Sequence, residues 1–165
     1  MRQIVKHRQC QADAWSMPGE AAAAAGVVVS LADYLAVQAG ALASPAPAGA
    51  ALGVQLEPAD DEAQLLPFAA QLQLVVVNFP KTAEGRGYTQ GRMLRERYGY
   101  RGELRAAGAV LLDQVFLLAR CGFDAFAMAP GENLTLAAAE LDRFSVAYQT
   151  AVGTVVQPHR RGQVG

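Results

Sequence analysis

Short apolar runs alternate with amphipathic stretches along most of this chain. Residues 74–79 are apolar at nearly every position, which is typical of a strand covered on both faces. Shorter runs of the same kind predict four further strands, at residues 26–29, 52–56, 103–106 and 123–128. The stretches between them predict helices at residues 31–38, 89–98, 110–120 and 134–144. Strands and helices that alternate in this way indicate a parallel sheet covered by helices.

Local signals refine two of these units. Ser30 is placed to cap the first helix, and Gly40 to end it. A further helix, between the second and third strands, would be capped by Asp60 or Asp61, and Pro67 should kink it or delay its start. Five strands are too few for a closed eight-stranded barrel, which typically takes about 250 residues. We therefore expect an α/β fold of repeated βα units, with an open, mostly parallel sheet or a partial barrel.

Length and composition predict a single domain. The chain has 165 residues, of which 52% are hydrophobic, and this is enough for one substantial core. We expect an irregular N-terminal segment at residues 1–25, the βα domain at 26–149 and a mobile, polar tail at 150–165. An open sheet has an exposed edge, and a homodimer would cover it.

Composition also limits the classes of function. A net charge of −1 and an isoelectric point near 6.1 argue against a dedicated nucleic-acid-binding protein, which usually has a value above about 9. The low-polarity run at residues 21–29 is too short to span a membrane, and the N-terminus lacks the apolar segment of a secretory signal peptide. We therefore expect a cytoplasmic protein that binds neither nucleic acid nor membranes. In that reducing compartment Cys10 and Cys121 should be free thiols.

Basic residues are concentrated at residues 80–105 of an otherwise acidic protein. Seven cations stand there against three glutamates, so the stretch carries about +4 and the rest of the chain about −5. The seven cations are Lys81, Arg86, Arg92, Arg95, Arg97, Arg101 and Arg105. This stretch is the one region of the sequence where we expect an anion to be held.

The predicted position of this stretch makes it a candidate anion-binding or partner-binding site. Ligands of parallel α/β sheets bind at the carboxyl ends of the strands, and Arg86 stands between glycines where the strand at 74–79 leads into a helix. Arg92 and Arg95 share a face of that helix, and Arg105 is expected at the end of the next strand. Tyr88 lies beside Arg86. The residues expected to support this site are Glu103, Asp113 and Gln114.

Simpler interpretations stay open for the same residues. Arg92 and Arg95 would also suit a solvated helix face, and Tyr88 would suit packing. Asp113 would serve as a helix cap as readily as a base. The sequence has no phosphate-loop, dinucleotide-binding or iron–sulfur pattern, and its two histidines lie near opposite termini. It therefore predicts no metal site and identifies neither a cofactor nor a catalytic residue.

The basic stretch belongs to a longer motif. Residues 84–114 read E-G-R-G-Y-T-Q-G-R-M-L-R-E-R-Y-G-Y-R-G-E-L-R-A-A-G-A-V-L-L-D-Q, and residues 119–126 continue with A-R-C-G-F-D-A-F. The motif resembles the bacterial family called domain of unknown function 934, and the resemblance covers roughly residues 26–149. The chain departs from the family pattern at three positions: Glu84 and Ala109 replace Asp, and Leu112 replaces Arg. If the replaced Asp and Arg carry chemistry, this chain would be impaired or have a different role.

The resemblance implies a role rather than a mechanism, because the family has no established catalytic residues. Its genes commonly lie beside those for assimilatory sulfite reductase, and its members are often labelled as oxidoreductases of sulfite reduction. One hypothesis is an accessory or oxidoreductase-like protein of that pathway, which binds a small oxyanion such as sulfite through Arg86, Arg92 and Arg105. The other is a non-catalytic partner that docks sulfite reductase or another acidic protein through its basic helix.

Overall fold

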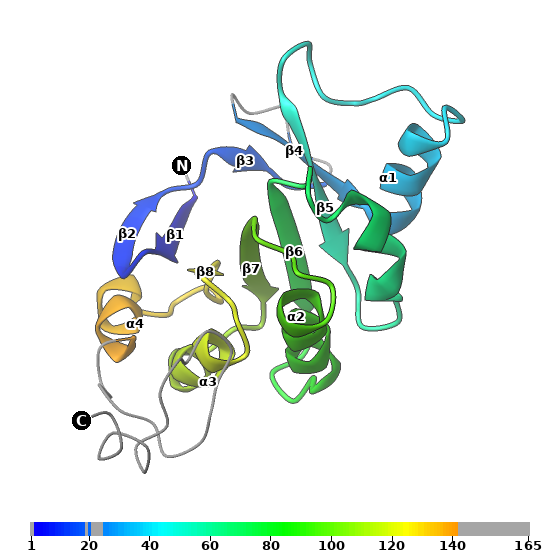
Figure 1. Cartoon of the computed structure of the whole chain (residues 1–165). Coiled ribbons are helices and arrows are strands. Elements are labelled where there is room, and N and C mark those ends of the chain that lie inside the picture. The colour runs from blue at the N-terminus through cyan, green and yellow to red at the C-terminus, as the bar shows by residue number, and fades with distance from the viewer. Residues whose placement is uncertain (1, 19, 21–24, 142–165) are drawn as a thin grey trace, which may run out of the picture.

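The computed structural model describes residues 2–18, 20 and 25–141, which are built around one eight-stranded sheet (Figure 1). The strands are β1 (Gln3–Lys6), β2 (Gln9–Ala12), β3 (Trp15–Ser16), β4 (Gly26–Ser30), β5 (Ala51–Leu56), β6 (Leu74–Phe79), β7 (Glu103–Gly108) and β8 (Ala125–Phe126). They lie in the order β2-β1-β8-β7-β6-β5-β4-β3. Neighbours from β3 to β8 are parallel, whereas β1 is antiparallel to both β8 and β2.

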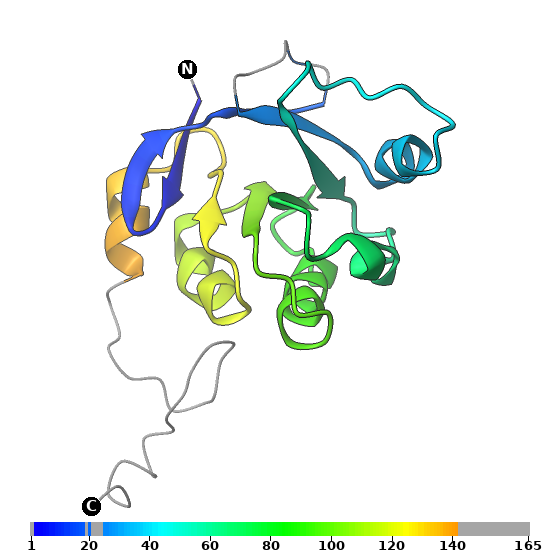
Figure 2. The same cartoon turned by 45° about the horizontal axis from the view of Figure 1, so that its top comes forward.

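The sheet curls into a half-barrel with the helices on its outer, convex side (Figure 2). The helices are α1 (Leu31–Gln38), η1 (Glu62–Phe68), α2 (Arg86–Glu96), η2 (Leu112–Gln114), α3 (Val115–Arg120) and α4 (Leu134–Glu140), of which η1 and η2 are 3-10 helices. Most of the core lies between helices and sheet, while Val28, Leu74 and Val76 form a smaller apolar cluster on the concave face. The prediction of a single α/β domain with a mostly parallel, partial-barrel-like sheet is confirmed.

Helix caps lie where the sequence predicts them. The Ser30 hydroxyl accepts a hydrogen bond from the backbone N–H of Asp33 at 3.1 Å, and Asp61 caps η1 in the same way. Pro67 lies inside η1, a 3-10 helix that already begins at Glu62, so the proline does not delay the start of this helix. Gly40 follows α1 with a φ of 72°, in the left-handed region that favours glycine.

Several element boundaries differ from the predictions. Helix α2 begins at Arg86, three residues earlier than expected, so the glycines at 85 and 87 flank its first residue instead of opening a loop. The helix predicted at 110–120 divides into η2 and α3, and the strand predicted at 123–128 shrinks to β8. Helix α4 is described as far as Glu140, and the expected extension to residue 144 lies outside the described residues.

The prediction of an irregular segment at residues 1–25 is wrong for residues 3–16, because β1, β2 and β3 all belong to the sheet. The hairpin between β1 and β2 turns at His7 and Arg8, which have φ values of 51° and 63°. Such turns usually carry Asn-Gly or Asp-Gly, so the sequence gives no turn signal there. Strand β2 is exposed along its whole length, and it therefore lacks the apolar alternation that marks a strand.

The N-terminal strands nearly close the half-barrel at one end. Strands β2 and β3 lie at opposite edges of the sheet, yet only Asp13 and Ala14 separate them in the chain. The two edges must therefore approach each other where β3 pairs with the first residues of β4, at the amino ends of the parallel strands. The Trp15 ring lies against Gly26 and Gly53 there, where a larger residue than glycine would collide with it. The carboxyl ends of the strands remain unbridged.

Candidate functional site

Arg105 is part of the interior of the half-barrel and not of its carboxyl end. It is the third residue of β7, its side chain is 1% exposed, and it forms ion pairs with Asp13 at 2.9 Å and with Glu103 at 2.7 Å. Lys6 binds the other carboxylate oxygen of Glu103 at 2.6 Å. The predicted position of Arg105 at the end of a strand is therefore wrong. Glu103 pairs with Arg105 and Lys6 in this buried cluster.

Arg95 also has a structural role. Its guanidinium donates hydrogen bonds to the backbone carbonyls of Tyr100, Gly102 and Gly122 at 2.8–2.9 Å, and it pairs with the Asp124 carboxylate at 2.8 Å. The same group lies 5.3 Å from the centre of the Tyr100 ring, in cation–π geometry. These contacts fasten the end of α2 to the amino ends of β7 and β8. Neither Arg95 nor Arg105 is available to a ligand that approaches Arg86.

The remaining arginines of α2 and of the turn after it are exposed. We call them the α2 arginine face, and its members are Arg86, Arg92, Arg97 and Arg101. Arg92 pairs with Glu96 one helical turn away at 2.8 Å, and 60% of its side chain stays exposed. Because α2 packs on the convex side of the sheet, its outer surface faces away from the molecule (Figure 1). These four arginines are spread along the helix and the turn after it, and they do not converge on one point.

The other predicted residues hold neighbouring elements together. Tyr88 packs edge-on against Phe79 with ring centres 5.4 Å apart, and burial raises the pKa of its hydroxyl. The Gln114 amide donates to the Thr82 carbonyl at 2.8 Å and accepts from the Leu111 N–H at 3.0 Å, so it connects the loops after β6 and β7. Asp113 is exposed beside it. The structure therefore does not bring the eight predicted residues together as one site.

A polar group that the sequence analysis missed occupies the carboxyl ends of β5 and β6. The Glu57 carboxylate accepts hydrogen bonds from the amides of Gln55 at 2.6 Å and Asn78 at 2.8 Å. Its backbone is fixed as well, because its N–H donates to Asp60 and its carbonyl accepts from Gln90. Within the described residues no cation pairs with Glu57, so it can accept a further hydrogen bond from a ligand. In the sequence this group could have been recognised by a carboxylate, Glu57, and an amide, Asn78, at the ends of two successive apolar strands.

The loops at the carboxyl ends of the parallel strands are acidic. The segments 30–33, 57–62, 80–86, 109–114 and 127–133 together contain eight acidic residues and two basic ones, Lys81 and Arg86. The basic stretch thus contributes only two cations to this end of the sheet. An excess of negative charge here opposes the binding of a small anion.

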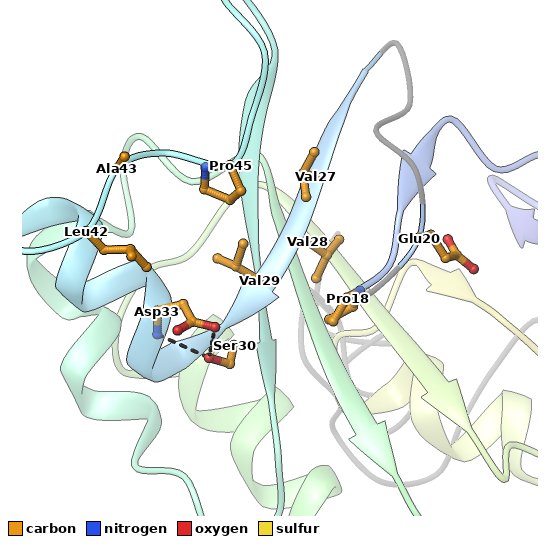
Figure 3. Close-up of a pocket in the computed structure, with 10 residues that line it drawn as sticks. All are labelled: Pro18, Glu20, Val27, Val28, Val29, Ser30, Asp33, Leu42, Ala43 and Pro45. Atoms are coloured by element: carbon orange, nitrogen blue, oxygen red, sulfur yellow. Dashed lines mark hydrogen bonds between the residues drawn. The ribbon is translucent and has the colours of Figure 1, made fainter.

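A cavity of about 460 Å³ crosses β4 next to this acidic end (Figure 3). Its walls are mostly apolar, and its polar members are Ser30, Asp33 and Glu20. Ser30 lies opposite Gln55 in the pairing of β4 with β5, so the cavity adjoins the strand that carries Glu57. Strand β3 pairs with β4 only at Gly26 and Val27, which leaves the rest of that edge without a neighbouring strand among the described residues.

Other classes of site are not formed by the described residues. Among them, no three His, Cys, Asp or Glu side chains lie close enough together to hold a metal ion, and no helix has the length and apolar character needed to cross a membrane. Cys10 is exposed and Cys121 is half-buried, and both are free thiols as predicted. Burial raises the pKa of the Cys121 thiol, which disfavours its reactive thiolate.

Comparison with known proteins identifies the family. Neither the curated proteins nor the solved structures include a match to this chain. Residues 53–158 match a family described as "Bacterial protein of unknown function (DUF934)". The matched region begins in β5 and contains the long motif with the α2 arginines and the polar residues Glu57 and Asn78. The chain therefore belongs to the DUF934 family of bacterial proteins of unknown function.

Proposed function

We propose that this protein is an accessory protein of assimilatory sulfite reduction, which docks an acidic surface of sulfite reductase through the α2 arginine face. Sulfite reduction is the role that the family resemblance implies, because genes of this family commonly lie beside those for sulfite reductase. The docking role is supported by one observation: Arg86, Arg92, Arg97 and Arg101 are all exposed along one helix and the turn after it. Arginine is favoured at protein interfaces because its planar fork binds carboxylates in pairs of hydrogen bonds.

This arrangement suits a protein surface better than a small oxyanion. An oxyanion site needs several donors aimed at one point, but Arg95 and Arg105 are committed to internal partners. Only Arg86 and Lys81 remain in the loops at the carboxyl ends of the strands, where acidic residues outnumber basic ones. Charges distributed along a helix instead steer and orient an extended partner of opposite charge.

The proposal is tested by the binding of purified sulfite reductase from the same organism, measured at low and at moderate salt. Arg97→Glu combined with Arg101→Glu should weaken binding by at least about tenfold, because opposite charges then become like charges. Neither arginine forms an ion pair with another of the described residues, so the fold should be unaffected. The matched control, Arg97→Lys with Arg101→Lys, keeps the charge and should lose far less. Wild-type affinity of the reversed variant, or no binding by the wild type, would contradict the proposal.

The alternative hypothesis, that the protein binds a small oxyanion, predicts a different result. If sulfite raises the melting temperature of the wild-type protein and Arg86→Ala abolishes this shift, the arginine at the start of α2 binds the anion directly. We expect no such shift at millimolar sulfite, because a single exposed arginine beside an acidic surface provides too little binding energy. A shift that depends on Arg86 would replace the docking role with a small-anion role.

A further inference from the structure

We propose that the cavity across β4 binds a small amphipathic organic cation, such as a primary alkylammonium ion. The inference depends on the shape and charge of the cavity and is independent of the α2 arginine face. The cavity is lined by Val27, Val28 and Val29 of β4, by Leu42, Ala43 and Pro45 on one side, and by Pro18 and Glu20 on the other (Figure 3). A volume of about 460 Å³ falls in the range of known small-molecule sites.

The walls favour a ligand with an apolar body. Three consecutive valines contribute to the cavity because it crosses the edge of β4 and so touches both faces of that strand. Leu42 is 45% exposed and lies in the wall of the cavity, beside the buried valines of β4. An alkyl chain in the cavity would shield the Leu42 side chain from water.

The charged residues that line the cavity indicate which charge the polar group of the ligand should carry. Of the described residues that line the cavity, the two ionisable ones, Asp33 and Glu20, are both acidic. Glu20 is already paired with Arg2 at 3.1 Å and accepts from the Met17 N–H at 2.8 Å. Asp33 accepts from the neutral Ser30 hydroxyl at 2.8 Å. Within the part of the chain that the structure describes, Asp33 is therefore the carboxylate of the cavity that lacks a cation.

The acidic residues around the cavity also favour a cationic ligand. Asp33 belongs to the acidic loops at the carboxyl ends of the strands, and Glu57 lies on the adjacent strand, also without a cation among the described residues. A negatively charged ligand would have to enter this field, whereas an ammonium ion would be attracted to it. An ammonium group also supplies three hydrogen-bond donors, which match the free acceptor sites of the Asp33 carboxylate.

The test uses three probes with the same alkyl chain: n-hexylammonium, 1-hexanol and hexanoate. Binding to the wild-type protein is followed by the amide signals of Val28, Val29 and Ser30 in proton–nitrogen correlation spectra. We expect hexylammonium to bind about five- to tenfold more tightly than hexanol, and hexanoate to bind most weakly, because charge attraction at a partly exposed carboxylate is moderate. Equal or tighter binding of hexanoate, or no shift with hexylammonium, would overturn the proposal.

Two variants and one control test whether the ligand binds in this cavity. Asp33→Asn keeps the shape of the side chain and an oxygen that accepts from the Ser30 hydroxyl, but it removes the charge, so hexylammonium should lose its advantage over hexanol. Asp61→Asn is the control, since Asp61 is likewise an exposed carboxylate at the start of a helix but lies outside the cavity, and this variant should bind like the wild type. Ala43→Phe should fill the cavity and abolish binding of all three probes. Unchanged binding in Asp33→Asn or Ala43→Phe would contradict the assigned site.

Discussion

The guanidinium of Arg105 lies 2.9 Å from both carboxylate oxygens of Asp13, although 92 residues separate the two in the chain. Both side chains are 1% exposed. Asp13 belongs to the short connection that joins opposite edges of the sheet, and Arg105 belongs to the central strand β7. The ion pair therefore crosses the inside of the half-barrel and holds its amino end closed.

Replacing Asp13 by Asn should destabilise the fold, because Arg105 would then be buried with only Glu103 to balance its charge. We expect the free energy of unfolding to fall by about 2 kcal/mol, somewhat less than for a buried ion left without any partner. Urea denaturation measures this change. Asp113→Asn, at an exposed position, is the control and should stay within about 0.5 kcal/mol of the wild type. Equal losses for the two variants would show that the buried pair does not stabilise the closure.

The close approach of α2 to the core depends on Gly91. A methyl group at this position would collide with the Phe123 ring, which is itself buried. Gly91→Ala should lower the free energy of unfolding by about 1–3 kcal/mol, even though alanine is the better helix former. Gly85→Ala is the control, because nothing lies within 4 Å of its added carbon, and thermal or urea unfolding should change by a few tenths of a kcal/mol. A stabilised Gly91→Ala variant would mean that α2 is not so tightly packed.

Alkaline pH should destabilise the protein through Tyr100. Burial raises the pKa of its hydroxyl far above the ordinary value of 10.0, and the hydroxyl donates to the Glu103 carbonyl at 2.9 Å. The unfolded chain therefore releases this proton first, so the contribution to stability is complete below pH 10 and is lost as the pH rises above it.

Tyr100→Phe removes this dependence. Between pH 9 and pH 11 the wild type should lose about 1.4 kcal/mol more stability than the variant, as measured by urea unfolding at each pH. At neutral pH the variant should be about 1 kcal/mol less stable, because the hydrogen bond to Glu103 is missing. Parallel pH profiles for the two proteins would show that Tyr100 ionises in the folded state.

The two thiols should differ in reactivity. Cys10 is exposed on β2, whereas Cys121 is half-buried and burial raises the pKa of its thiol. A thiol-disulfide reagent should modify Cys10 at least about tenfold faster in the folded protein, because only the thiolate reacts. Cys10→Ser should remove the fast phase and leave the slow one. A single common rate would contradict the buried position of Cys121.

The parallel sheet could be predicted from the sequence because buried strands leave continuous apolar runs, as at residues 74–79. The N-terminal strands could not, since β2 is fully exposed and the turn at His7 and Arg8 has no glycine. In addition, β1 pairs with β8, which lies far away in the sequence, and β3 is only two residues long. Local patterns contain no information about such pairings.

The candidate site was predicted less well because the position of an arginine does not reveal what its side chain binds. Arg92 and Arg95 stand three residues apart on one helix, yet Arg92 faces solvent and Arg95 is held by carbonyls up to 27 residues away. The pairing of Arg105 with Glu103 could have been predicted, because residues two apart in a strand lie on the same face of the sheet. Glu57 and Asn78 were recognisable only once their strands were known to be neighbours.

A structural division runs through the basic stretch: Arg95 and Arg105 hold the fold through internal partners, whereas Arg86, Arg92, Arg97 and Arg101 are exposed. Urea unfolding of Arg105→Ala beside Arg97→Ala tests it most directly, because the first side chain is buried and the second is exposed. We predict a loss of about 3–5 kcal/mol for Arg105→Ala, which breaks the buried ion pairs with Asp13 and Glu103 and leaves a cavity in the interior, and a change within about 0.5 kcal/mol for Arg97→Ala. A comparable loss in both variants, or none in Arg105→Ala, would contradict this division.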